Sequence, residues 1–141
     1  MKYWKDHDEP IKAFVRLMEE SFKDAELSAS LQSVNQLIWF DYTQDAPDCS
    51  FWVNVRPGKL EVGKGKPDGT PDLIMSTSAD NAHLSWSNKL SPIMAITRKI
   101  IIVKGSATGL LKLAPKLSKV AKIYEQVLKE LGWEDKIVQQ S

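Results

Sequence analysis

The side chains best suited to acid–base chemistry in this sequence are His83 and Asp41. A histidine titrates near neutral pH, and a carboxylate within reach could orient it or exchange a proton with it. The two residues are therefore candidates for the acid and base of a small enzyme. A histidine in a helical segment is more often structural, so both interpretations of His83 stay open.

Other catalytic or metal-binding patterns are missing from the sequence. Cys49 is the only cysteine, no base stands beside it, and the G-x-S-x-G motif of many hydrolases does not occur. Two histidines and one cysteine, without H-x-x-x-H or C-x-x-C spacing, do not make a dedicated metal site. The glycine-rich stretch 63–69 lacks the order of a phosphate-binding loop, and we interpret it as a connection between strands. We expect no metal and no cofactor.

The length and charge of the chain exclude further classes of protein. The 141 residues suit one domain, 1–141, and 19 basic against 18 acidic residues leave no excess for binding nucleic acid. The lysines of the stretch 112–122 recur at near-helical spacing, which indicates a solvated helix face, with transient contact to a membrane surface as the alternative. Because the single cysteine suits a reducing compartment and the start lacks an apolar signal core, we predict a cytoplasmic protein.

Hydrophobic periodicity predicts an α+β chain. Apolar residues at three- and four-residue spacing indicate helices at 8–25 and 117–131. β-Branched and aromatic runs indicate strands at 37–42, 51–56, 59–62, 72–77 and 99–105. The first and last of these strands are apolar on both faces, which predicts that both faces are buried. Between the last two strands, Ser78 or Asp80 can start one short helix and Pro92 another.

The short helical connections contain more apolar residues than two short helices need to cover the sheet. This surplus consists of Trp86, Leu90, Ile93, Met94 and Ile96, followed by Leu110, Leu111 and Leu113. Core packing explains such a surplus, and so does the wall of an internal cavity. Both explanations stay open.

Two consecutive segments resemble the sterol carrier protein type 2 family. The family's strand, its serine–acid helix start and its G-K-L-x-P turn are similar to residues 72–80, DLIMSTSAD, and 83–95, HLSWSNKLSPIMA. The similarity continues through residues 99–113, KIIIVKGSATGLLKL, which look like the family's basic and apolar strand, its glycine and its next helix. Asn88 and Arg98 stand where the family often has glycine, so we expect both turns to differ in shape.

The resemblance implies a five-stranded, mostly antiparallel sheet with helices covering one face and an apolar tunnel between them. It implies a lipid carrier, monomeric or weakly dimeric, that holds a fatty acid, acyl ester, sterol or phospholipid without covalent chemistry. The sequence does not end in a peroxisomal S-K-L signal, which favours a stand-alone prokaryotic version. The alternatives are a small enzyme that acts on a lipid-like substrate through His83 and Asp41, and a protein-interaction domain that uses its C-terminal helix.

The residues that we expect to line the tunnel come from the strands and the connections. They are Trp39, Met75, Trp86, Ile93, Met94, Ile100, Ile102, Leu110, Leu113 and Leu117. The facing of the strands stays open, because neighbours such as Ile101 are equally apolar. The segment 110–113 lies between Gly109 and Pro115, which interrupt regular helix, so we expect it to form a movable cover with Leu110 as its inward anchor.

Overall fold

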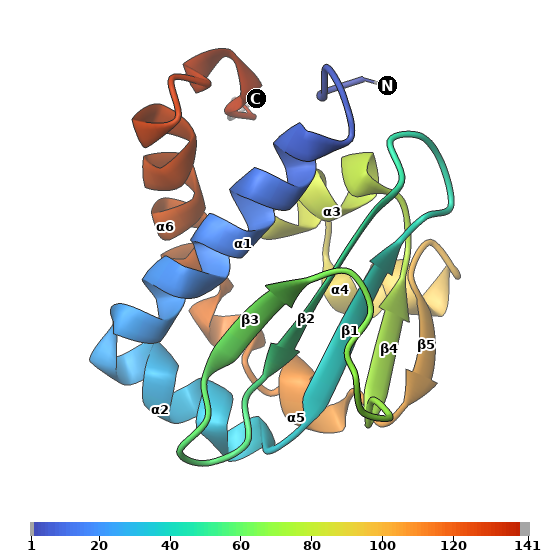
Figure 1. Ribbon diagram of the computed structural model, residues 1–141, viewed down its shortest axis with the longest axis vertical. Helices are drawn as coiled ribbons and strands as arrows, with labels where there is room; N and C mark the ends of the chain where they lie inside the picture. The colour runs from blue at the N-terminus through green and yellow to red at the C-terminus, as the bar shows by residue number, and fades with distance from the viewer. Residues whose placement is uncertain (1, 139–141) are drawn as a thin grey trace.

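The computed structural model describes residues 2–138 and contains a five-stranded sheet in the order β3-β2-β1-β4-β5 (Figure 1). The strands are β1 (Leu37–Tyr42), β2 (Cys49–Asn54), β3 (Glu61–Lys64), β4 (Leu73–Ser76) and β5 (Ile102–Gly105). The middle strand, β1, runs parallel to β4, whereas the other three pairs of strands are antiparallel. The expected α+β fold with a mostly antiparallel five-stranded sheet is confirmed.

Side chains alternate between the two faces of the sheet, as the two-residue period of a β-strand requires. Ile38, Phe40 and Tyr42 of β1 share one face with Phe51 and Val53 of β2, and all five side chains are buried. The rings of Phe40 and Phe51 stack with their centroids 4.8 Å apart. This face of the sheet forms one wall of the hydrophobic core.

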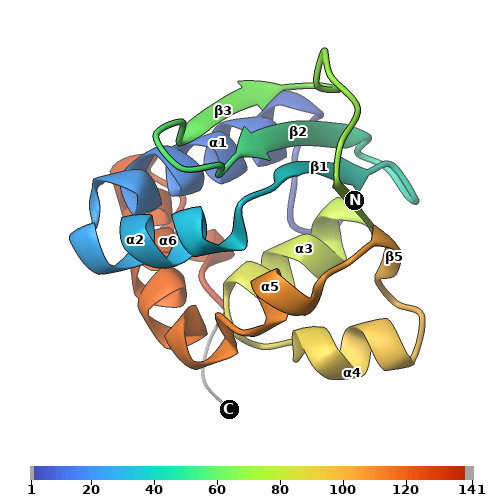
Figure 2. The same cartoon turned by 90° about the horizontal axis from the view of Figure 1, so that it is seen from below.

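The helices of the described chain lie on that buried face. They are α1 (Asp8–Lys23), α2 (Ala25–Val34), α3 (Ala79–Trp86), α4 (Pro92–Thr97), α5 (Thr108–Leu111) and α6 (Leu117–Glu130), with 3₁₀ turns η1 (Ala114–Lys116) and η2 (Glu134–Lys136). Figure 2 shows strands β3, β2 and β1 along the top with α3, α4 and α5 beneath them. The expectation that helices cover one face of the sheet is confirmed.

Side-chain caps set the starts of the helices that follow strands and turns. The hydroxyl of Ser78 accepts a hydrogen bond from the backbone N–H of Asn81 over 3.1 Å, and Ser91 plays the same part before Pro92. Such caps satisfy backbone donors that have no partner within the helix. Of the two predicted starts of the first short helix, Ser78 and Asp80, the cap is Ser78, and the second short helix begins at Pro92 as predicted.

The long helices α1 and α6 bury their apolar stripes against the sheet and each other. The ring of Phe14 in α1 lies 5.9 Å from Phe51 of β2 and 6.1 Å from Tyr124 of α6, measured between centroids. Val127 and Leu128 of α6 are also buried. The apolar face of α6, which a protein-interaction domain would need to display, is thus part of the core.

The opposite face of the sheet carries a short row of apolar side chains, Trp52, Trp39 and Ile74, on neighbouring strands in register. The Nζ of Lys66 lies 5.5 Å from the centre of the Trp39 ring, a cation–π distance. The Trp52 ring lies directly over Gly63, where a Cβ atom would collide with it. No helix of residues 2–138 covers this face.

Three parts of the chain, β1, α2 and β5, differ from the sequence-based expectation. Helix α2 was not predicted, because serines interrupt its apolar spacing and its hydrophobic residues are few. Its start is stabilised from outside the helix, since Asp24 caps the N–H of Leu27 over 2.9 Å and pairs with Lys119 over 3.0 Å. Strands β1 and β5 were expected to be buried on both faces. The outer face of β1 has no covering helix among residues 2–138, and β5 is an edge strand whose Ile102 is 40% exposed.

Each of the two turns around α4 contains one residue in the left-handed conformation. Asn88 has φ of 59°, in the left-handed region that asparagine tolerates better than most residues. At the second turn Arg98 stays at φ of −87°, and Lys99 takes the left-handed conformation with φ of 59°. Each turn thus has one residue in the left-handed region, Asn88 itself in the first turn and the residue after Arg98 in the second. The partly ordered tail expected from Trp133 onward forms η2, and residues 139–141 lie outside the described residues.

Candidate functional site

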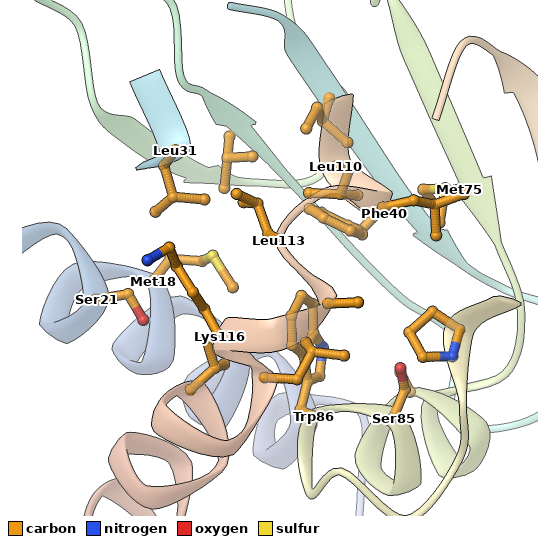
Figure 3. Close-up of a pocket in the computed structure, with 18 of the residues that line it drawn as sticks. Met18, Ser21, Leu31, Phe40, Met75, Ser85, Trp86, Leu110, Leu113 and Lys116 are labelled. Atoms are coloured by element: carbon orange, nitrogen blue, oxygen red, sulfur yellow. The ribbon is translucent and has the colours of Figure 1, made fainter. Parts of the chain in front are cut away.

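An apolar cavity lies between the buried face of the sheet and the helices (Figure 3). From the strands and the residues just after them it is lined by Ile38, Phe40, Tyr42, Val53, Val55, Met75 and Thr77. From the helices and connections it is lined by Met18, Ser21, Leu27, Leu31, Ala82, Ser85, Trp86, Pro92, Ile101, Leu110, Leu111, Leu113, Ala114, Lys116, Leu117 and Val120. Apolar side chains therefore dominate the wall.

The cavity is large enough for part of a lipid chain. Measured for the centre of a water-sized sphere, its volume is about 110 Å³. One water needs roughly 10–15 Å³ by this measure, so the cavity has room for about eight groups of that size. A methylene group is similar in size to a water molecule, so an acyl segment of comparable length fits.

One end of the cavity is polar. Lys116 is the one charged residue of the lining, and its side chain is 32% exposed. Its Nζ donates to Oε1 of Glu26 over 2.7 Å, and this bond, with a second from Lys119, holds the pKa of Glu26 below its ordinary value. The hydroxyl of Ser21 is buried and has no hydrogen-bond partner among the described residues. Figure 3 shows Lys116 beside Met18 and Ser21.

The other end is built from aromatic and sulfur-containing side chains. Met75 of β4 stands next to Phe40 in the register of the sheet, and the Phe40 ring meets the edge of Trp86 at 5.7 Å between centroids. The hydroxyl of Thr77 also lines the cavity, but it donates to the carbonyl of Ile100 over 2.8 Å. This end therefore offers an apolar wall to a ligand.

Half of the residues predicted to line a tunnel border this cavity. They are Met75, Trp86, Leu110, Leu113 and Leu117. Figure 3 shows Leu110 and Leu113 between Leu31 and Phe40. Residues from a strand, from α3 and from the connection before α6 thus meet at one cavity although they are far apart in the sequence.

The other five predicted residues, Trp39, Ile93, Met94, Ile100 and Ile102, lie outside the lining. Trp39 points to the other face of the sheet because its neighbours Ile38 and Phe40 point inward. Alternation also explains the positions of the isoleucines at the start of β5. Ile101 borders the cavity, and Ile102 faces solvent on the edge strand.

In α4 the inward positions belong to other residues. Pro92 lines the cavity and Ala95 is fully buried, whereas Ile93 is 55% and Met94 47% exposed. The large apolar side chains of Ile93 and Met94, which were predicted to line the tunnel, thus lie on the outer face of this six-residue helix. Ile100 is half-buried against the core, with its N–H bonded to the carbonyl of Ala95 over 2.8 Å.

Several lining residues were not predicted. Alternation along β1 and β2 was sufficient to find Phe40 and Val53, since each lies two residues from another buried apolar position. Met18 belongs to the apolar stripe of α1, which was recognised as a core face only. Leu27 and Leu31 come from the unpredicted helix α2 and had no usable signal.

The acid–base pair of the enzyme alternative is not assembled. His83 is 0% exposed, in the helical layer, with Nδ1 bonded to the Tyr124 hydroxyl over 2.6 Å and Nε2 to the Lys136 carbonyl over 2.8 Å. Burial lowers the pKa of His83 to about 4. Asp41 lies between Phe40 and Tyr42 on β1 and points to the opposite face of the sheet. The two side chains therefore cannot exchange a proton.

The single cysteine is also poorly suited to nucleophilic chemistry. Cys49 is buried, and its burial raises the pKa of the thiol to about 12. Because the thiolate is the reactive form, such a thiol is inert at neutral pH. Within residues 2–138, His, Cys, Asp and Glu side chains form no cluster of three or more that could hold a metal ion.

The helices of the described residues are too short or too polar to cross a bilayer.

The fold is similar to that of sterol carrier protein 2 domains of known structure. The chain aligns over 84% of its length with 95% of the sterol carrier protein domain 2 of Helicoverpa armigera, at 20% identity and a TM-score of 0.64. Sterol Carrier Protein 2 of Yarrowia lipolytica in its apo form aligns with 90% of this chain and 98% of its own, at 17% identity and a TM-score of 0.59. Palmitated SCP2L2 of Aedes aegypti aligns with 78% of this chain and 89% of its own, at 18% identity and a TM-score of 0.51.

No curated protein matches the sequence at a significant level. The sequence profile of the SCP-2 sterol transfer family matches residues 14–122, which include all five strands, the helices α2 to α5, most of α1 and the start of α6. That match covers the walls of the cavity from Met18 to Val120. The chain therefore belongs to the SCP-2 sterol transfer family.

Proposed function

We propose that this protein binds the acyl chain of a lipid in the cavity and carries it without chemical change. The observation that carries this proposal is the wall itself, in which apolar side chains of the sheet and of the helices line one cavity. A pocket with an apolar lining and few polar groups suits a hydrophobic ligand. Membership of a lipid-transfer family supports the same conclusion.

Transfer energetics make such binding strong enough to be useful. Removing one methylene from water contributes about 0.8 kcal/mol, so about eight methylenes contribute roughly 6 kcal/mol before the costs of ordering the ligand. A longer chain gains more where it can extend toward the exposed end of the cavity near Lys116. Because methylene groups discriminate weakly, we propose a broad range of ligands: fatty acids, acyl esters, sterols or phospholipids.

The two ends of the cavity suggest how a ligand lies in it. We place the polar group beside Lys116 and Ser21, whose ammonium and unpartnered hydroxyl can bind a carboxylate or an ester carbonyl. The tail then lies against Phe40, Met75 and Trp86. The palmitated form of SCP2L2 from Aedes aegypti supports a fatty acid as one ligand.

The segment 110–113 is the part of the wall that we propose moves when a ligand passes. It spans the end of α5 and the turn before η1, contains no buried residue, and has Lys112 exposed. Leu110 and Leu113 face the cavity. A segment with few buried contacts opens at low cost in free energy.

We further propose that the carrier works in the cytoplasm as a monomer or weak homodimer. The one cysteine is buried and unpaired, and a protein without disulfides is suited to a reducing compartment.

Native mass spectrometry of freshly purified protein tests the function, followed by titration with fluorescent fatty acids of increasing chain length. We expect bound lipid, and affinity that rises with chain length. A Ser85→Phe variant, which fills the cavity, should bind about tenfold or more weakly. The matched control Ser118→Phe, at an exposed position of α6, should bind as the parent does. Absence of bound lipid together with no dependence on chain length would refute the proposal.

A further inference from the structure

The outer face of α4 displays large apolar side chains to solvent. Ile93 and Met94 are 55% and 47% exposed, and Thr97 and Arg98 complete the same face at helical spacing. We call these four residues the α4 face. The inner side of the same helix holds Ala95, which is fully buried, and Pro92, which lines the cavity. One short helix therefore separates the cavity from an exposed apolar surface.

The chain around α4 is basic and lacks acidic residues. Residues 81–124 contain eight lysines and arginines and no aspartate or glutamate. Lys89 precedes helix α4, and Arg98 and Lys99 follow its last residue; all three are exposed. Within residues 2–138 none of these three forms an ion pair. Apolar side chains thus lie among unneutralised positive charges.

The other basic stretch of this segment does not have this character. Lys116 and Lys119 pair with Glu26 and Asp24 of the α2 region over 2.7 and 3.0 Å. Figure 2 shows α2 and α6 on one side of the molecule and α4 on the other. The lysines at the start of α6 are therefore neutralised in part, and the α4 face is the better positive and apolar surface.

We propose that the α4 face is the surface by which this protein docks on an anionic phospholipid bilayer. Ile93 and Met94 insert among the acyl chains at the boundary of the bilayer, while Lys89, Arg98 and Lys99 contact the negatively charged headgroups. Its role in lipid exchange rests on the proposed function, because docking there brings the cavity wall at Pro92 to the bilayer. The docking itself can be measured without any ligand in the cavity.

The chemistry of the surface favours a bilayer over other partners. Amphipathic segments that lie in the interface bury their apolar face about 5–10 Å deep and hold it there with lysine and arginine. Anionic headgroups attract such cations within a Debye length. Two apolar side chains among three cations satisfy both conditions, whereas an acidic soluble partner would leave Ile93 and Met94 without a function.

Co-sedimentation with vesicles tests the proposal. The protein should sediment with vesicles of phosphatidylcholine mixed with phosphatidylglycerol but not with vesicles of pure phosphatidylcholine. Added salt should release it from the anionic vesicles. The variant Ile93→Ser/Met94→Ser should partition roughly tenfold more weakly, and so should Lys89→Glu/Arg98→Glu. The control Lys12→Glu/Lys59→Glu alters net charge equally at exposed positions away from α4 and should bind as the parent does.

A site-specific probe gives an independent readout. Met94→Cys labelled with an environment-sensitive fluorophore should shift to shorter wavelength on anionic vesicles, and Lys59→Cys should not. Cys49 is buried and its thiol pKa is raised to about 12, so the label goes to the introduced cysteine. No sedimentation of the parent, or equal sedimentation of the Ile93→Ser/Met94→Ser variant, would overturn the proposal. Self-association through α4 in ultracentrifugation, without vesicle binding, would overturn it in favour of a second copy.

The membrane docking and the proposed carrier function can be refuted independently of each other. Binding of a fluorescent fatty acid in vesicle-free solution should be unchanged in Ile93→Ser/Met94→Ser, because neither side chain lines the cavity. A parent protein that sediments with vesicles but takes up no fatty acid would refute the carrier function alone.

Discussion

The hydroxyl of Tyr124 donates a hydrogen bond to Nδ1 of His83 over 2.6 Å inside the helical layer. The opposite nitrogen, Nε2, donates to the carbonyl of Lys136 over 2.8 Å, so a neutral imidazole satisfies both contacts. The turn η2 is thereby attached to α3 and α6 through one buried ring. Protonation would turn Nδ1 into a donor, so the bond with Tyr124 would have to reverse, and the tyrosine O–H would lose its acceptor.

The first prediction is that stability falls in mild acid. Burial lowers the pKa of His83 to about 4, against 6.5 in an unfolded chain, so between these values the unfolded state binds the proton more readily. The contribution is fully present above pH 6.5 and is lost as the pH falls through about 4, by roughly 3 kcal/mol in total. Urea unfolding at a series of pH values measures it. His83→Gln should remove most of the decline, and His7→Gln, at an exposed position, should keep it.

The second prediction concerns the polar end of the cavity. Replacing Lys116 by Met removes the charged group of the lining and should weaken binding of a fatty acid about fivefold, since a charged hydrogen bond contributes roughly 1 kcal/mol or more. The corresponding fatty alcohol should bind with unchanged affinity. Lys112→Met, at an exposed position, is the control. Equal losses for acid and alcohol would place the head group elsewhere.

The third prediction tests the cover. Leu110→Glu puts a carboxylate against apolar walls, which costs several kcal/mol unless the group reaches water or takes up a proton. Lipid affinity should fall about tenfold or more with little change in the melting temperature. Ile102→Glu, at an exposed edge position, should bind normally. If Leu110→Glu binds like the parent, the segment is not part of the binding wall; if it unfolds, Leu110 belongs to the structural core.

The fourth prediction is that acyl esters leave the protein intact. The buried His83 is not within reach of Asp41, and the Cys49 thiol is held protonated. Chromatography of a bound ester after long incubation should recover it unchanged. Hydrolysis that increases with time and disappears in His83→Ala would establish an enzyme instead.

The sheet could be predicted well because its strands obey simple rules. β1 was predicted with its exact bounds, since its β-branched and aromatic residues end abruptly at polar neighbours. Turn residues and caps located α3 and α4 with equal success. Helix α2 could not be found, because its stability depends on contacts such as Lys119 with Asp24 that are distant in sequence.

Half of the residues predicted to line the tunnel border the cavity, and geometry explains why the others do not. In the run Ile100 to Ile102 hydrophobicity has no alternation, so the one residue that faces the cavity, Ile101, cannot be told from its neighbours. A helix as short as α4 likewise leaves its direction undetermined, and the large residues Ile93 and Met94 lie outside while Pro92 and Ala95 lie inside. Positions anchored by a second cue, such as Leu110 after Gly109, were placed at the cavity.

The position of Trp86 makes the cavity visible to ordinary spectroscopy. Of the five tryptophans, Trp86 is the one among the lining residues, while Trp39 and Trp52 lie on the far face of the sheet. Indole emission depends on the polarity around the ring, so a ligand in the cavity should change the emission of Trp86 more than that of the other four. The difference between the spectra of filled and empty protein should therefore report mainly on Trp86. Intrinsic tryptophan fluorescence should therefore follow ligand binding in the cavity in real time without an added label.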